Sequence, residues 1–275
     1  MNKTHIALAT ALIASVSTFT RAEDAPAAAT SAPASDWTVT GNMALSSDYR
    51  TRGISQTDKK PALSGGFDVS HSSGFYFGNW NSNIDSRYYN GANIEMDFYG
   101  GFKYPVGPVT FDLGAFYYYY PGSGRNSGVS DGRGIDEKEI YIAASYGPVT
   151  AKVYFPIGDF FSAQKNLGGK NASDSIYVDL SGSHDLGSGF GLIGHLGYQN
   201  ISGGGKFLFP KMNTSKYYSG DYMDWKLGVT YSFANGFVAA VSYIDTDIDT
   251  PNSFVPGGKK SISGATGVFS LSKTF

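Results

Sequence analysis

Apolar and polar side chains alternate with a period of two through most of the chain. In the last segment, residues 262–275, Phe269 and Leu271 lie on one face and Ser270 and Ser272 on the other. Such alternation is typical of a β-strand with one apolar and one polar face. The same pattern, weakest in the third segment, predicts twelve strands near residues 37–46, 63–70, 75–85, 92–104, 109–117, 139–146, 149–155, 176–181, 190–199, 223–233, 237–245 and 262–275.

The connections between these segments alternate in length. Short connections rich in turn residues follow every second segment, at Ser72–Gly74, Pro105–Pro108, Gly147–Pro148, Leu186–Gly189 and Ala234–Gly236. Longer connections lie between them, at roughly 50–61, 85–91, 121–136, 158–174, 200–221 and 246–260. Long loops on one side and short turns on the other are the pattern of outer-membrane barrels. We therefore predict an all-β fold, a transmembrane antiparallel up-and-down β-barrel of about 12 strands over residues 36–275.

Residues 262–275 are predicted to close this barrel. A strand edge left unpaired in lipid would expose backbone groups that nothing can satisfy. The last strand should therefore pair antiparallel with the strand that begins at Trp37, with its apolar face toward lipid and Lys273 reaching the head groups. Phe275 resembles the C-terminal aromatic that the barrel-assembly machinery recognises. The expected partners are accordingly outer-membrane lipid and that machinery.

Aromatic residues gather at the ends of the predicted strands, where two belts of rings are expected at the lipid head groups. The belt on the turn side would contain Trp37, Tyr104, Tyr146, Phe190, Phe233, Phe237 and Phe275. The belt on the loop side would contain Tyr49, Trp80, Tyr117–Tyr120, Phe155 and Tyr243. The alternative is that these rings form the core of a soluble β-sandwich. The alternation of loop lengths and the terminal aromatic argue against it.

The N-terminus has the features of a secretory signal peptide, residues 1–22. Lys3 precedes a mildly apolar stretch, Ile6–Phe19, and Ala22 ends a small-residue cleavage site. Residues 23–35 are rich in Ala, Pro and Ser, and we expect a flexible periplasmic segment there. The protein is thus expected to be exported to the outer membrane of a Gram-negative cell.

Composition removes several classes of function. The chain has a formal net charge of -2, which gives no reason to expect nucleic-acid binding. It has no cysteine, which excludes disulfides, zinc–thiolate sites, iron–sulfur clusters and thiol nucleophiles. No apolar run of about 18 residues follows the N-terminal segment, which excludes a helical membrane protein.

One stretch carries a family resemblance. Tyr49–Thr57 reads Y-R-T-R-G-I-S-Q-T, and residues 60–67 and 70–76 read K-P-A-L-S-G-G-F and S-H-S-S-G-F-Y. With these, the chain resembles the TorF-type porins, a group also catalogued as the Gcw_chp family of proteobacterial exported proteins. The resemblance extends over essentially the whole exported chain. It implies an outer-membrane barrel that acts as a porin, and it carries no catalytic residues.

Charged residues on the polar faces are the candidate functional residues. If the apolar faces meet lipid, the candidate pore-lining residues are Asp68, Glu95, Asp97, Lys103, Asp112, Glu139, Lys152, Asp179, Asp224 and Lys226. Seven carboxylates against three lysines, with His195 nearby, would favour cations in a water-filled lumen. A barrel of about 12 strands lies between those that side chains fill and those that leave a channel. The alternative is therefore an interior closed by paired charges.

Other motifs are weaker. His71-Ser72-Ser73 matches the H-x-S motif of a lipid A deacylase. It lies in a predicted turn, however, and His71 is on the face that is predicted to meet lipid. Asp245–Asp249 offers oxygen ligands without the glycine and glutamate of an EF-hand loop. Gly168–Lys170 and Gly203–Lys206 lack the spacing of a phosphate-binding loop. We expect no catalytic residue, metal or cofactor.

The function predicted from these observations is passive diffusion of small polar, cationic solutes. Asn200–Asp221 is the largest loop and the candidate constriction. A closed barrel with a structural or surface-interaction role is the second hypothesis, and an outer-membrane hydrolase is the third. The pattern does not indicate an oligomeric state.

Overall fold

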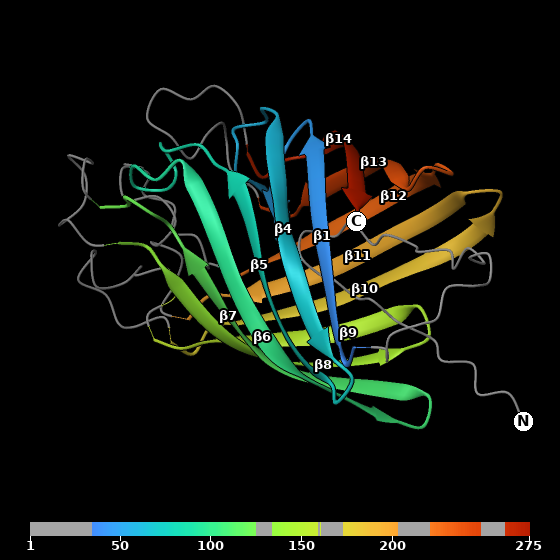
Figure 1. Ribbon diagram of the computed structural model, residues 1–275. Helices are drawn as coiled ribbons and strands as arrows, with labels where there is room; N and C mark the ends of the chain where they lie inside the picture. The colour runs from blue at the N-terminus through green and yellow to red at the C-terminus, as the bar shows by residue number, and fades with distance from the viewer. Residues whose placement is uncertain (1–34, 125–133, 159, 161–172, 203–220, 249–261) are drawn as a thin grey trace, which may run out of the picture.

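The alternating segments form the strands of a closed antiparallel barrel (Figure 1). The computed structural model describes residues 35–124, 134–158, 160, 173–202, 221–248 and 262–275. Within these residues the barrel has twelve strands, β1 (Trp37–Ser46), β4 (Ala62–His71), β5 (Phe75–Asn83), β6 (Ile94–Val106), β7 (Val109–Tyr119), β8 (Glu137–Tyr146), β9 (Val149–Pro156), β10 (Ile176–Gly187), β11 (Phe190–Asn200), β12 (Tyr222–Ser232), β13 (Phe237–Thr246) and β14 (Thr266–Thr274). Two short strands, β2 (Arg50–Thr51) and β3 (Ile54–Ser55), pair with each other inside the first long connection.

The sheet closes through its first and last strands, as predicted. Each barrel strand pairs antiparallel with its neighbour along the chain, and β1 pairs with β14 so that Leu45 lies opposite Leu271. Gly41 and Phe275 exchange two backbone hydrogen bonds of 2.7 and 2.9 Å. The predicted fold class is therefore confirmed. The closing strand begins at Thr266, later than predicted, because the residues before it bend.

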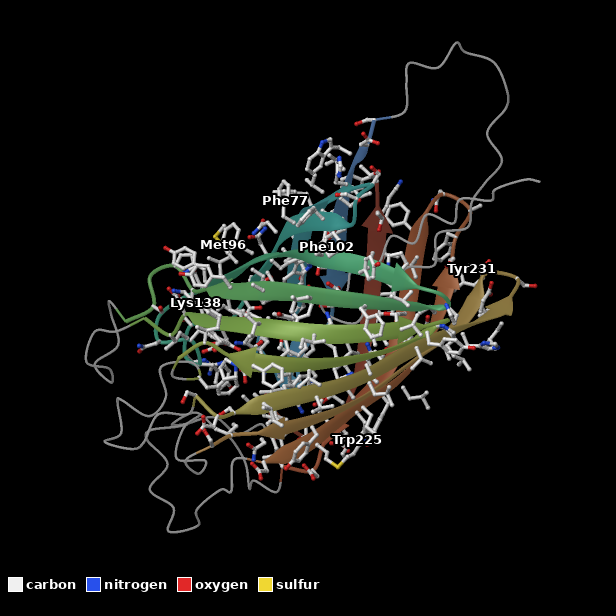
Figure 2. All side chains as sticks on the ribbon, turned by 90° about the horizontal axis from the view of Figure 1, so that it is seen from below. Phe77, Met96, Phe102, Lys138, Trp225 and Tyr231 are labelled. Atoms are coloured by element: carbon white, nitrogen blue, oxygen red, sulfur yellow. The ribbon has the colours of Figure 1, made fainter. Side chains whose placement is uncertain are left out.

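Large apolar side chains project outward from every barrel strand. Val39 on β1 is 66% exposed, Leu113 on β7 60% and Leu227 on β12 65%. Figure 2 shows Phe77 and Trp225 projecting from opposite sides of the barrel. The apolar faces thus point outward and the polar faces point inward, as the alternation predicts. An apolar band around a closed barrel suits a hydrocarbon environment.

The short connections lie at one end of the barrel, the turn end, and the long connections lie at the other, the loop end (Figure 1). Gly107-Pro108 joins β6 to β7, and Gly147-Pro148 joins β8 to β9. The two glycines have φ values of 57° and 53°, the left-handed backbone that a two-residue turn beginning with glycine requires. The repeated Gly-Pro-Val-Thr tetrapeptide is therefore one turn used twice.

Aromatic rings fill much of the interior, and glycines on neighbouring strands make room for them. A Cβ atom at Gly78 or Gly114 would lie 2.4 Å from the phenol oxygen of Tyr99 or Tyr141, respectively. Tyr99 stacks in turn on Phe116, with ring centroids 5.5 Å apart. Substituting these glycines would displace the rings that pack the barrel interior.

The predicted aromatic belt on the loop side is wrong at four positions. Tyr49, Trp80, Tyr118 and Tyr120 are inside the barrel and only 6%, 6%, 8% and 3% exposed. Successive strand residues point to opposite faces, so a run of four tyrosines cannot all face outward. Tyr119, which points outward, is 38% exposed.

The predicted signal peptide, residues 1–22, and all but the last residue of the predicted flexible segment, 23–35, lie outside the described residues. In the part of the chain that the structure describes, no helix has the length and apolar character needed to cross a membrane.

Candidate functional site

The first long connection, residues 47–61, folds into the barrel, where the sequence predicted an external loop. Its strands β2 and β3 pair Arg50 with Ser55 and Thr51 with Ile54. We call residues 50–55 the hairpin. Its side chains reach the inner walls of β8, β11 and β14, and its backbone touches β12 and β13.

The tip of the hairpin is a two-residue turn. Arg52 and Gly53 have φ values of 47° and 78°, the pair of left-handed conformations that a type I′ turn requires. Gly53 also lies directly against the wall. A Cβ atom there would be 2.4 Å from Cγ2 of Thr246 and 2.7 Å from Cβ of Asp224. Glycine is thus required at this position both by the backbone and by the lack of space.

Arg52 fastens the tip to the far wall. Its Nη2 donates to both carboxylate oxygens of Glu139, at 2.8 and 2.6 Å, and its Nη1 donates to Oε1 of Gln199 at 2.8 Å. The guanidinium carbon lies 4.3 Å from the ring centroid of Tyr177 and 5.3 Å from that of Tyr154. The guanidinium is therefore held by charge, hydrogen bonds and aromatic faces together.

Arg50 fastens the base of the hairpin to the closing strand. Its Nε donates to Oδ2 of Asp48 at 2.8 Å, and its Nη2 donates to Oγ1 of Thr266 at 2.8 Å. Its Nη1 donates to the carbonyl oxygen of Gly264 at 3.0 Å. Asp48 also accepts from Oγ of Ser55 at 2.5 Å. The hairpin is thus anchored by one arginine at each end.

The hairpin packs the loop half of the lumen. Four of the predicted pore-lining carboxylates lie there and are 1% exposed: Glu95, Asp97, Glu139 and Asp224. Tyr49 donates a 2.5 Å hydrogen bond to Oε1 of Glu95. The hairpin and its neighbours therefore leave little open cross-section at this level.

A cavity of about 120 Å³ lies against the hairpin. Arg52 and Gly53 line it together with Asp97, Tyr118 and Lys226. Oδ1 of Asp97 is buried and has no hydrogen-bond partner among the described residues. The cavity wall thus includes a carboxylate whose buried oxygen is unsatisfied.

His195 joins two of the predicted residues in the same cavity wall. Its Nε2 lies 2.7 Å from Oδ1 of Asp224, and its Nδ1 lies 2.8 Å from Oδ2 of Asp179. Both ring nitrogens donate only when the imidazole is protonated, so this geometry suits a positively charged histidine between two carboxylates. Ser181 and Tyr177 complete the cluster through contacts to His195 of 3.1 and 3.2 Å.

The turn half of the lumen is more open. Asp68, Lys103 and Asp112 are all partly exposed. Tyr99 donates to Oδ1 of Asp68 at 2.5 Å, and Tyr76 donates to Oδ1 of Asp112 at 2.7 Å. The Lys103 ammonium lies 4.9 Å from the Tyr76 ring centroid. Water therefore reaches these charges from the turn end.

The structure accordingly divides the ten predicted residues into groups. Glu95, Asp97, Glu139 and Asp224 are buried around the hairpin, and Lys152 and Lys226, each 7% exposed, lie close to full burial. Asp68, Lys103, Asp112 and Asp179 are partly exposed. Lys152 lies over the ring of Tyr141, 4.3 Å from its centroid.

The sequence prediction missed the two arginines of the hairpin and the inward tyrosines. Thr51-Arg52-Gly53-Ile54 is a signal for a tight hairpin, because glycine stands where a left-handed residue is needed. Tyr141, Tyr154 and Tyr177 occupy the polar register of their strands, so their inward direction could be read from the alternation. That the hairpin folds inward could not be read from it.

Ion pairs at the loop end connect the first long connection to the second. Arg87 lies 2.5 Å from Oδ2 of Asp58 and 2.7 Å from Oδ2 of Asp85, and Lys60 lies 3.1 Å from Oδ2 of Asp85. Hydrogen bonds from Arg87 hold the pKa of the Asp85 carboxyl well below its usual range. Burial acts to raise the pKa of Asp58, but bonds from Arg87 and Tyr88 outweigh it and lower that pKa.

The remaining motifs supply no second site. Nδ1 of His71 lies 2.7 Å from Oγ of Ser73 and also accepts from the Ser73 backbone at 3.2 Å, which is a local turn contact. Within the described ranges, no group of His, Asp or Glu is arranged to hold a metal ion. The predicted constriction, Asn200–Asp221, lies largely outside the described residues, as do Gly168–Lys170 and Gly203–Lys206.

Comparisons with known proteins agree with this architecture. The family model described as "Bacterial protein of unknown function (Gcw_chp)" matches residues 30–275. No curated protein matches the chain. The structure of the NanC porin has a TM-score of 0.52 at 8% identity, and the match covers 86% of this chain and 99% of NanC. At this identity the likeness shows the fold alone, that of a porin barrel.

Two other solved structures match less closely in shape. The KdgM porin in complex with disordered oligogalacturonate has a TM-score of 0.46 at 4% identity, covering 86% of this chain and 98% of KdgM. The outer membrane protein opdK from Pseudomonas aeruginosa has a TM-score of 0.38 at 13% identity, covering 89% of this chain and 68% of opdK.

Proposed function

The chain belongs to the Gcw_chp family, and we propose that it is an outer-membrane porin of the TorF type, giving passive diffusion to small polar solutes. The observation that carries this proposal is a closed barrel with an apolar exterior, a polar interior and a hairpin folded into its lumen. Such a barrel offers polar solutes a route through lipid, and the hairpin narrows that route.

The proposed path has two parts. The turn half is a vestibule whose charges water reaches, including Asp68 and Asp112. The loop half is the constriction, where Arg52 crosses to Glu139 and Gln199. Diffusion then requires the hairpin to move or solutes to pass beside it, which restricts passage to small molecules.

The proposed solute preference is for cations. Two carboxylates, Asp48 and Glu137, join the seven predicted ones inside the barrel, and Arg50 and Arg52 join the three lysines. Among the described residues, nine carboxylates thus stand against five basic side chains and His195. Arg50 and Arg52 reduce the excess of negative charge that the strand residues give the lumen, but they do not reverse it. A net negative lumen raises the local concentration of cations.

Purified protein in planar bilayers would test this function. We expect discrete channel openings and a reversal potential in a potassium chloride gradient that shows potassium preference. Liposomes containing the protein should swell in small polar solutes faster than empty liposomes. An anion-selective reversal potential would contradict the cation preference, and swelling no faster than that of empty liposomes would contradict the porin.

A closed barrel with a structural role is the second candidate, and the ion pairs favour it. Arg50 pairs with Asp48, Arg52 with Glu139, and His195 lies between two carboxylates. Paired charges and a packed hairpin are the features of a filled interior. If the hairpin never leaves this position, recordings will show no openings, while the protein still inserts as a folded barrel.

A further inference from the structure

Arg52 occupies a binding site that the barrel wall supplies. Glu139 and Gln199 are each 1% exposed, and both aim their oxygens at the guanidinium. Tyr177 and Tyr154 add aromatic faces at 4.3 and 5.3 Å from the guanidinium carbon. Three oxygen acceptors plus aromatic faces match the planar, forked donor set of a guanidinium better than the point charge of an ammonium.

The group that fills this site is Arg52 of the hairpin, whose two short strands pair with each other. β2 and β3 pair at two positions, and the turn between them is Arg52-Gly53. Any solute that crosses the constriction by moving the tip must first remove Arg52 from Glu139. A neutral solute would then leave a buried carboxylate without a counter-charge, which is strongly unfavourable. A guanidinium solute would restore the same contacts.

A second observation points to a cation in the same place. Asp97 is 1% exposed and lines the cavity against which Arg52 lies, and its Oδ1 has no hydrogen-bond partner among the described residues. Tyr49 and Tyr118 line that cavity as well. A buried carboxylate beside aromatic rings attracts a second positive group.

We propose that the wall formed by Glu139, Gln199, Tyr154 and Tyr177 is a subsite for guanidinium-bearing solutes, which pass the constriction by replacing Arg52. The inference rests on the proposed porin function and names the solute class that this function favours. Arg52 then blocks the constriction, and it fills the subsite with the same guanidinium group that the solute carries.

Matched solutes distinguish this subsite from general cation preference. Arginine and citrulline have the same shape, but citrulline has a neutral urea group in place of the guanidinium, and lysine carries a charge without the fork. In liposome influx assays we expect wild-type protein to pass arginine about tenfold faster than citrulline, because only arginine can replace the Arg52 ion pair. Arginine should also pass faster than lysine.

Two variants locate the effect. Glu139→Gln removes the carboxylate and frees the tip, so all rates should rise while the arginine-to-lysine ratio falls to about one, since the fork has lost its charged partner. Asp112→Asn removes a lumen carboxylate in the turn half, and it should slow arginine and lysine alike. Equal influx of arginine and citrulline in wild type, or an arginine-to-lysine ratio unchanged by Glu139→Gln, would overturn the subsite.

The outcomes separate this inference from the porin itself. If glycine and small sugars enter but arginine shows no advantage over citrulline and lysine, the proposed porin function stands and the subsite is refuted. No influx of any solute would refute both. Arg52→Ala gives a readout without transport, because the vacated subsite should bind free guanidinium ion, measured as a saturable heat change by isothermal titration calorimetry. The same titration in the Arg52→Ala/Glu139→Gln double variant should show no saturable change, and a saturable one would count against the subsite.

Discussion

Gly53 is the residue on which the inward position of the hairpin depends most directly. Its φ of 78° is one that side chains disfavour, and its Cα packs against the inner wall at Thr246 and Asp224. A backbone that fits against a wall in this way has no room for a larger residue. The other hairpin contacts are made by flexible side chains, which can adjust to small displacements.

Gly53→Ala should therefore expel the tip while leaving the barrel folded. The left-handed backbone alone costs about 1–2 kcal/mol for a residue with a side chain, and the clash with the wall adds to that cost. Gly122→Ala is the matched control, because Gly122 has a φ of 82° with no atom within 4 Å of its ideal Cβ. We expect higher conductance in Gly53→Ala and wild-type conductance in Gly122→Ala. Equal conductance in all three proteins would show that the hairpin does not limit flow.

The direction of most side chains could be predicted from the sequence, because a period of two fixes alternate faces. Val39 and Leu113 point outward and Asp97 and Glu139 inward, as the alternation predicts. The contacts could not be predicted in this way. That Arg52 meets Glu139 depends on how a loop folds across a barrel, which brings together residues 87 positions apart.

The carboxylates of Asp58 and Asp85 at the loop end should make the contact between the first and second long connections depend on pH. The pKa values of Asp58 and Asp85 are lowered in the folded protein, so their contribution is complete above the ordinary carboxyl pKa of about 4 and is lost as pH falls through the lower, folded values. These groups are partly exposed, so the effect should be below about 1 kcal/mol. Arg87→Gln should shorten the closed intervals of the channel equally at about pH 7 and about pH 5, and the difference from wild type should begin to shrink only below about pH 4 and should persist in part at about pH 3, because the folded pKa of Asp85 lies lower still. A difference that vanishes already between the two higher values would contradict these pKa directions.

At the scale of elements, β14 closes the barrel and supplies anchor points for the hairpin. Its C-terminal half, Ser270–Thr274, pairs with β1, and Thr266 at its start accepts a hydrogen bond from Arg50. The strand, its facing and its partner follow from the sequence, because a lipid-facing sheet must close. The inward position of the hairpin does not follow, because β2 and β3 are two residues each and give too short an alternation to show which way the hairpin folds.

Deleting Phe275 should impair assembly before it alters transport. Its backbone pairs with Gly41 on β1, and its ring is 67% exposed at the turn end, where it remains available to an assembly factor. We expect a large fall in the amount of folded protein in outer-membrane fractions, detected as heat-modifiable mobility in gels. Phe275→Tyr, which keeps an aromatic ring, is the control and should assemble normally. Unchanged membrane levels of the deletion variant would refute the proposed signal.

At the scale of the whole molecule, the barrel is divided along its axis. The turn half has partly exposed charges, and the loop half is packed around the hairpin, with Glu95 and Asp224 1% exposed. The likeness to the NanC porin concerns the fold of the barrel, whereas the proposed path through it depends on this chain's own hairpin and lumen charges. We therefore propose that one inward hairpin controls a water path through a closed barrel.

Single-channel conductance of Arg52→Ala beside wild type tests this claim most directly. The substitution removes the 2.6 Å ion pair to Glu139. Breaking a buried pair of this kind should make the free energy of docking the hairpin on the wall less favourable by about 3 kcal/mol. Lys138→Ala, which changes a side chain on the outer face of β8, serves as the control. We expect small or brief openings in wild type and Lys138→Ala, and larger or longer openings in Arg52→Ala. Folded barrels that give no openings in any of the three proteins, or openings of the same size and duration in all, would contradict it.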